Sequence, residues 1–136
     1  MRLKIQLISD GKILFEMPLS IADWSREKLE DEFIASEEEF GKFSRLFDAL
    51  SHETRLRMMR QLLEDENHTA SFADFMRNLD LNPKTVWENS RKLEETGLVR
   101  RTGRGKYRCS DFGQTAFIMM SLALHRIMES LERNEF

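Results

Sequence analysis

The sequence contains one cysteine, two prolines and six glycines in 136 residues. The single cysteine, Cys109, excludes an intrachain disulfide and a thiolate cluster for zinc. Because proline and glycine are scarce, long linkers are not expected. No run approaches the roughly 18 apolar residues that span a bilayer, and charges interrupt the N-terminal MRLKIQLISDGKILFE, which therefore lacks the apolar centre of a signal peptide. We expect a cytoplasmic protein with no membrane partner.

Residues that commonly build catalytic or metal centres are also sparse. The three histidines, His52, His68 and His125, lie far apart in the sequence and share no ligand spacing. We interpret them as ordinary surface or helix-end side chains. Neither a nucleophile with its base, nor a phosphate-binding loop, nor a metal motif is present. The sequence therefore predicts no catalytic residues, no metal and no cofactor in a protein that is not an enzyme.

Charge is distributed unevenly along the chain. The whole sequence has a formal net charge of −3. Residues 82–108 nevertheless carry eight Lys or Arg against three Glu, a net charge of +5, which leaves −8 on the remainder. Such a local reversal of sign steers an anion toward one face. The stretch RRTGRGKYR contains no acid, so a solvated helix of mixed charge does not explain it.

The N-terminal residues predict a β-hairpin followed by a helix. Apolar residues alternate in LKIQL and again in ILFEM, and the Asp10-Gly11 pair between them is a strong hairpin signal. Because an isolated hairpin is marginal in water, its apolar face must cover another surface, in the same chain or in a partner. Asp23 or Ser25 caps the helix. Residues 23–39, with eight acids and two bases, form either a solvated face or a surface that repels DNA or binds a basic partner.

Helical spacing of apolar residues continues in the middle of the chain. Residues 43–50 form one predicted helix, and Ser51 is the predicted N-cap of the next. The second helix carries an apolar stripe with arginines around it, Leu56, Met59 and Leu63 with Arg55, Arg57 and Arg60.

Capping signals then define two further helices. Ser71 with Asp74 resembles a capping box. Asn82 followed by Pro83 is a good helix start, and this helix runs to residue 96, where Gly97 supplies the C-terminal cap. A helix, a short turn and a second helix are therefore expected between residues 71 and 97.

Two short strands around a glycine-bearing loop are predicted in LVRRTGRGKYRCS. Tyr107 and Cys109 alternate with Arg108, so we expect the first two to face inward. Helix, turn, helix and basic hairpin is the order of a winged helix-turn-helix. In that arrangement the second helix enters the major groove, and Lys or Arg of the wing neutralise backbone phosphates.

We therefore expect helix 82–96 to read the major groove of double-stranded DNA and wing 98–110 to contact its backbone. The predicted DNA-binding residues are Lys84, Thr85, Trp87, Glu88, Arg91, Arg101, Arg104 and Lys106. The Trp87 indole packs either on DNA or against the N-terminal hairpin. Arg100 and Arg108 either contact DNA or pair with nearby glutamates.

Two stretches resemble a known family. LFDALSHETRLRMMRQLLED resembles the opening of ArsR-type winged-helix regulators, and SFADFMRNLDLNPKTVWENSRKLEETGLVRRTGRGKYR resembles their helix-turn-helix and wing. The similarity covers about Phe47 to Ser110, close to half of the chain. It implies a dimeric, repressor-like transcription factor.

Three positions depart from the pattern of that family. HTASFADF contains no cysteine where metal-sensing members usually carry a pair, so metal sensing at that site is not expected. Asp80 stands in the turn where many relatives have glycine, and aspartate tolerates the left-handed conformation. Ser90 replaces a usual leucine in the inward stripe of Val86, Ser90 and Leu93, and we expect its hydroxyl to bond to the carbonyl of Val86.

The last helix shows a heptad pattern. Its predicted dimerisation residues are Phe117, Met120, Leu124, Ile127 and Leu131, at steps of three and four. Such a seam packs either on the core of its own chain or on a partner, and its breadth favours a homodimer. A two-fold dimer would present two reading helices about one DNA turn apart.

The predicted fold class is mainly α with small β elements (α+β). We divide the chain into an N-terminal β-hairpin and acidic helical extension (1–42), a winged helix-turn-helix DNA-binding core (43–112) and a C-terminal dimerisation helix (113–136). The predicted function is that of a sequence-specific transcriptional regulator. The alternative is a winged-helix protein-interaction module in a larger nucleic-acid-associated assembly. The ten Phe and eight Met either form plain core or line a pocket for a small-molecule effector.

Overall fold

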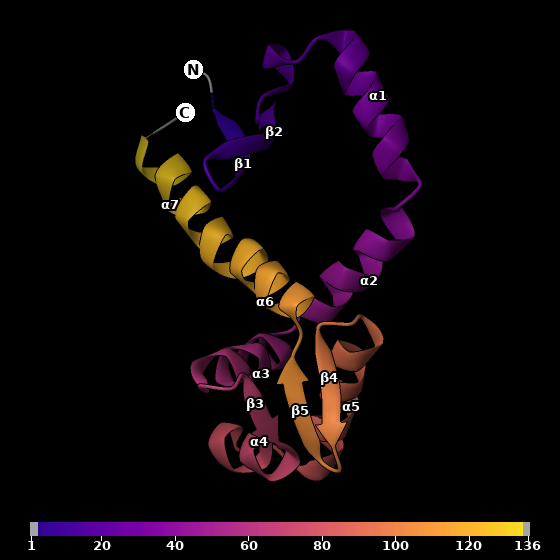
Figure 1. Ribbon diagram of the computed structural model, residues 1–136, viewed down its shortest axis with the longest axis vertical. Helices are drawn as coiled ribbons and strands as arrows, with labels where there is room; N and C mark the ends of the chain where they lie inside the picture. Colours follow the sequence, from indigo (N-terminus) through magenta and orange to yellow (C-terminus); the bar gives the residue numbers. More distant parts are fainter. Residues whose placement is uncertain (1–2, 135–136) are drawn as a thin grey trace. The chain divides into compact units, whose positions relative to one another are not determined.

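The computed structural model describes residues 3–134, which form two compact units that divide between Gly41 and Lys42 (Figure 1). The first unit contains β1 (Lys4–Ser9), β2 (Lys12–Pro18), a 3-10 turn (Ile21–Asp23) and α1 (Arg26–Glu37). The second contains α2 (Phe40–Leu50), whose first two residues precede the division, then α3 (Glu53–Glu64), β3 (Thr69–Ser71), α4 (Phe72–Leu79) and α5 (Pro83–Glu95). It continues with β4 (Val99–Gly103), β5 (Lys106–Cys109), α6 (Asp111–Phe117), a π-helical segment (Ile118–Ala123) and α7 (Leu124–Asn134). The predicted class, mainly helical with small antiparallel sheets, is confirmed.

The N-terminal unit is built on the predicted hairpin. Asp10 and Gly11 have φ angles of 49° and 78°, the pair of positive values that a type I′ turn requires. The two strands pair antiparallel, with a bulge that leaves Leu14 without a partner across the hairpin. Ser25, the second of the two predicted caps, accepts a hydrogen bond from the amide of Lys28 at 3.2 Å.

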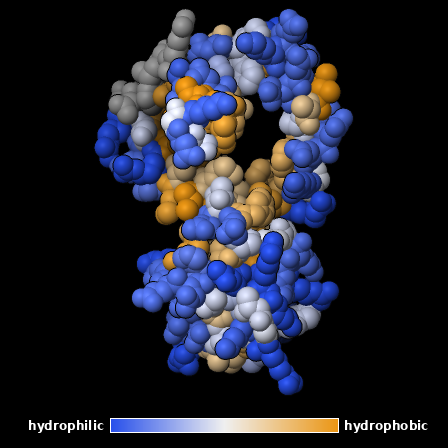
Figure 2. Space-filling model, viewed as in Figure 1, coloured by the Kyte–Doolittle hydropathy of each residue, from blue (hydrophilic) through white to orange (hydrophobic). Residues whose placement is uncertain are grey.

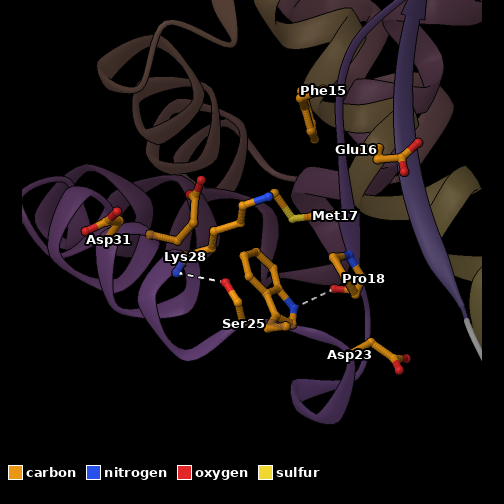
Figure 3. A pocket seen from close by; sticks show the side chains of 10 residues that line it. Phe15, Glu16, Met17, Pro18, Asp23, Ser25, Lys28 and Asp31 are labelled. Carbon is orange, nitrogen blue, oxygen red and sulfur yellow. Dashed lines mark hydrogen bonds between the residues drawn. The ribbon is translucent and has the colours of Figure 1, made fainter.

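A cavity of about 840 Å³ opens between β2 and α1 (Figure 3). Trp24 lines it, and its indole donates a hydrogen bond to the Pro18 carbonyl at 3.0 Å. Lys28 extends across the cavity toward Met17. The bond from Trp24 joins the segment before α1 to the end of the hairpin.

This first unit has no core of its own, because no residue from 3 to 41 is buried. Exposed apolar side chains cover its strands, namely Ile5, Leu7, Ile8, Ile13, Leu14 and Phe15. Figure 2 shows the corresponding apolar colour over the hairpin. Since two strands alone are marginal in water, the expectation that this face covers another surface stays a prediction.

The second unit holds the core. Helices α3, α4 and α5 pack with a three-stranded antiparallel sheet of order β3-β5-β4 (Figure 1). The largest fully buried side chains are Tyr107, Phe75, Met58, Met59, Leu62, Leu93, Leu98 and Val86. The Phe75 and Tyr107 rings lie 5.9 Å apart between centroids, within the range of favourable aromatic pairs. Tyr107 and Cys109 face inward from β5, as predicted.

Local capping signals predicted most helix ends correctly. Ser71 and Asp74 form a complete capping box, and the Asn82 side chain accepts from the amide of Thr85 at 2.8 Å. Asp80 adopts the expected left-handed conformation, with φ 52°. The prediction for Ser51 was wrong, since its hydroxyl donates to the Asp48 carbonyl and does not cap α3.

Arg55 also differs from the prediction, which placed it beside the apolar stripe. It is buried, because its guanidinium satisfies groups at the end of α2 and on α5. Nε donates to the Ala49 carbonyl at 2.7 Å, and Nη2 donates to the Asp48 carbonyl at 2.9 Å. Nη1 donates to Oδ1 of the buried Asn89 at 2.8 Å. One side chain therefore closes the C-terminal end of α2 and ties it to α5.

We predict that Arg55→Met lowers the free energy of unfolding by about 2–4 kcal/mol, because three acceptors, two of them on the buried residues Ala49 and Asn89, lose a charged donor. The matched control is Arg57→Met, two residues away on the exposed face, which should cost less than about 0.5 kcal/mol. Urea denaturation followed by circular dichroism measures both. Equal losses in the two variants would contradict the role given to Arg55.

Candidate nucleic-acid interface

The inner face of α5 fixes the orientation of the helix. Val86, Ser90 and Leu93 are buried, as expected. The Ser90 hydroxyl donates to the carbonyl of Trp87 at 3.2 Å and lies 3.5 Å from the Tyr107 hydroxyl. The predicted bond to the Val86 carbonyl was therefore wrong. Ser90 therefore connects α5 to the wing strand β5 through the buried Tyr107 hydroxyl. A leucine at position 90 has no polar atom and could not make this contact.

A second tie holds α5 to α2. Lys92 Nζ lies 3.1 Å from Asp48 Oδ2. The hydrogen bond from Lys92 holds the pKa of the Asp48 carboxyl below its ordinary value. Asn89 accepts from Arg55 and donates to the carbonyl of Thr85 at 2.8 Å. Sequence reasoning missed Arg55 and Asn89, since nothing local marks a charged residue as buried.

The outer face of α5 carries the predicted groove residues. Lys84, Trp87, Glu88 and Arg91 are exposed, and Thr85 is half-buried near the cap. Trp87 is 49% exposed on this face of the helix. The Arg91 guanidinium lies 5.1 Å from the centroid of its ring, a cation–π contact that holds both side chains on one surface.

Two of these cations already have partners on the same helix. Lys84 Nζ lies 3.9 Å from Glu88 Oε1, and Arg91 Nε lies 3.1 Å from Glu95 Oε1. Exposed pairs of this kind contribute only a few tenths of a kcal/mol. A phosphate or a guanine edge can therefore displace either glutamate at small cost.

The wing carries cations of two kinds. Arg101 Nε lies 3.3 Å from Glu94 Oε1, and its guanidinium lies 5.7 Å from the Tyr107 ring centroid, so this residue fastens β4 to α5. Arg104 and Lys106 are exposed at the tip and form no ion pair with any described residue. Gly105, with φ 67°, turns the chain between them. The tip therefore presents two free cations.

The base of the wing meets α6 very closely. A Cβ on Gly113 would lie 2.0 Å from the Leu98 carbonyl oxygen, so no side chain fits there. The neighbouring Cys109 is buried, and burial, with the Asp111 charge, raises the pKa of its thiol to about 11. A protonated, enclosed thiol is a poor nucleophile, so Cys109 serves packing.

The predicted seam of the last helix is divided by the π-helical segment at Ile118–Ala123. Phe117 belongs to the buried core of its own chain, and Met120 packs against that core. A π-helix adds residues per turn, so positions after it rotate away from the seam that a regular helix predicts. Leu124 and Leu131 are 46% and 39% exposed, and Ile127 is half-buried.

The other exposed apolar residues of this helix are Ile118, Met119, Leu122 and Met128. Figure 2 shows apolar colour along the helix that follows the wing, in contrast with the hydrophilic face of the helix-turn-helix and wing. The surface available for association is therefore centred on residues 118–131.

Within residues 3–134 no group of three His, Cys, Asp or Glu side chains is placed to hold a metal ion. No helix in the same range is long and apolar enough to cross a membrane.

Solved structures provide the comparison. No protein-family model matches the sequence, and no curated protein is significantly similar to it. The AntR antimony-specific transcriptional repressor is 23% identical with a TM-score of 0.57, and the match covers 84% of this chain and 96% of that one. The transcriptional repressor BigR from Xylella fastidiosa is 23% identical with a TM-score of 0.53, covering 76% and 96%.

A third structure is the homodimeric winged helix-turn-helix DNA-binding domain of Mb0332 from Mycobacterium bovis, described as a possible ArsR-family transcriptional regulator. It is 20% identical with a TM-score of 0.55, and the match covers 74% of this chain and 90% of that one. Sequence identities this low, with these TM-scores, show that the proteins share a fold. The chain has the winged helix-turn-helix fold that the resemblance to ArsR-type regulators predicted.

Proposed function

We propose that this protein is a sequence-specific, double-stranded DNA-binding transcriptional regulator of the cytoplasm that acts as a homodimer. Helix α5 reads the major groove, and the β4–β5 wing follows the adjacent backbone. The observation that carries the proposal is the pairing of an exposed α5 face with a wing tip whose cations, Arg104 and Lys106, lack acidic partners in the described chain.

The groove face suits base readout. Lys84 and Arg91 are the candidates for guanine or phosphate contacts, and Glu88 can accept from cytosine once Lys84 changes partner. Trp87 offers a large apolar surface to a thymine methyl or a sugar. Arg101 is a further candidate for a backbone contact, and its pair with Glu94 can be exchanged at small cost.

Homodimerisation rests on the exposed apolar residues of α7 and the segment before it. A terminal helix with several exposed Leu, Ile and Met side chains presents the kind of patch that marks an association surface. Two-fold symmetry would place two α5 helices about one turn of DNA apart. The homodimeric state of the Mb0332 domain supports this arrangement.

A protein-interaction module is the second candidate, favoured by the exposed apolar strands of the N-terminal hairpin. Selection from a random duplex pool at moderate salt separates the two. A regulator enriches a near-palindrome with half-sites about one turn apart. A bound pool with no enriched sequence would favour the interaction module.

Replacing both tip cations tests the wing. We predict that Arg104→Ala/Lys106→Ala flattens the log–log dependence of DNA affinity on salt by about two per protomer, because two phosphates are no longer neutralised. Fluorescence anisotropy between low and moderate salt measures the slope. The control Arg57→Ala/Arg60→Ala removes two exposed, internally paired cations from α3 and should leave the slope unchanged. An unaltered slope in the wing variant would remove the wing from the interface.

Charge placed on the apolar surface of α7 tests the dimer. We predict that Leu124→Glu/Met128→Glu gives a folded monomer in sedimentation equilibrium and weakens operator binding by about 100-fold or more, because the second half-site is no longer tethered. Arg126→Glu places a carboxylate elsewhere on the same helix and is the control. A variant that remains dimeric would show that another surface joins the protomers.

A further inference from the structure

Two arginines stand directly opposite each other in the sheet of the wing. In the β4–β5 ladder Arg100 pairs with Arg108, and in the β3–β5 ladder Thr69 pairs with Arg108. Side chains on one row of a sheet point to the same face, so both guanidinium groups lie together on the side away from the buried Tyr107. Like charges directly opposite each other destabilise a sheet.

No carboxylate in the described chain forms an ion pair with either arginine. Glu94 pairs with Arg101 and Glu95 with Arg91, so the predicted pairing of these glutamates with Arg100 or Arg108 is not formed. Neither arginine has an acidic partner within 4.0 Å among residues 3–134. Two cations held together without a counter-ion are a feature that an anion would stabilise.

The pair borders a hollow of about 410 Å³, a size typical of sites for small ligands. Thr102 lines it from β4, and Phe112, 47% exposed, lines it from α6. Asp111 is the one acidic residue of the lining, and it forms no ion pair with either arginine. Two free guanidinium groups against one carboxylate leave the hollow net positive.

The hollow lies at the base of the wing. In Figure 1 the base of the β4–β5 hairpin joins α6, and the tip lies at the opposite end. At about 3.3 Å per residue, Arg100 lies about 13 Å from Arg104, four residues along the chain, whereas Arg108 lies about 7 Å from Lys106 on the same face of β5. The site is therefore distinct from Arg104 and adjoins Lys106.

We propose that Arg100 and Arg108 bind one phosphate group in this hollow. The planar guanidinium fork matches phosphate oxygens with two parallel hydrogen bonds, and two such forks line this hollow. The phosphate belongs either to the DNA backbone or to a small phosphate monoester whose organic part rests on Phe112. Only the first source depends on the proposed DNA-binding function.

The first test uses inorganic phosphate and phenyl phosphate on the full chain without DNA. We expect both to raise the Tm of the wild type above that in chloride of equal ionic strength. Arg100→Gln and Arg108→Gln should each lose most of that rise, while Arg57→Gln, a matched exposed arginine on α3, should keep it. A phosphate effect equal in all three variants would overturn the proposal.

The same variants carry a second readout in the absence of phosphate. Because either substitution ends the repulsion, Arg100→Gln and Arg108→Gln should raise the Tm at low salt by roughly 1–4 °C. Arg57→Gln loses an exposed ion pair and should not raise it. A lowered Tm in both wing variants would contradict the absence of a counter-ion.

The salt dependence of DNA affinity then identifies the source of the phosphate. If a backbone phosphate fills the site, each wing variant loses about one unit of slope per protomer and inorganic phosphate competes with DNA. If a free ester fills it, the slope is unchanged while the phosphate-dependent rise in Tm remains. If the protein bound no DNA at all, the proposed function would be refuted. The phosphate-dependent rise in Tm, which is measured without DNA, would still test the phosphate site.

Discussion

The arrangement of the winged-helix unit depends on the guanidinium of Arg55. Helices α2, α3 and α5 converge on it, and it occupies carbonyl groups that a helix end leaves without partners. A buried charge is tolerated because every bond goes to an oxygen with no competing cation. The bond between Arg55 and Asn89 adds to the buried contacts that set the direction of α5. An exposed ion pair between Lys92 and the Asp48 carboxylate also joins α5 to α2.

The exposed face of α5 is ordered before any ligand arrives. Arg91 is held between Trp87 and Glu95, and Lys84 lies near Glu88. Weak pairs of this kind restrict the rotamers of long side chains, which reduces the entropy lost on binding. The same glutamates disfavour a ligand that offers only negative charge. When Lys84 or Arg91 leaves its glutamate for such a ligand, the unpaired carboxylate lies close to the ligand and repels it. The cations of the wing tip have no paired carboxylate in the described chain, so we expect them to attract any anionic ligand without selecting among ligands.

Sequence reasoning succeeded where the cause is local. The Asp10-Gly11 turn, the Ser71 and Asn82 caps and the inward Tyr107 follow from side chains within a few residues. It failed where a distant partner decides the outcome. Arg55 is buried because α5 supplies Asn89, and Ser90 turns toward Tyr107, 17 residues away. The π-helical segment has no local marker either, so a regular heptad placed Phe117 in a seam when it fills the core.

The glycine at position 113 has a mechanical consequence. Its backbone lies against the Leu98 carbonyl with no room for a side chain, and Ser110 bonds to the Gly97 and Leu98 carbonyls from the same corner. No side chain therefore separates the backbone of Gly113 in α6 from that of Leu98 before β4. A displacement of α6 would therefore press directly on the chain at the start of β4. We expect the wing and α6 to move as one body.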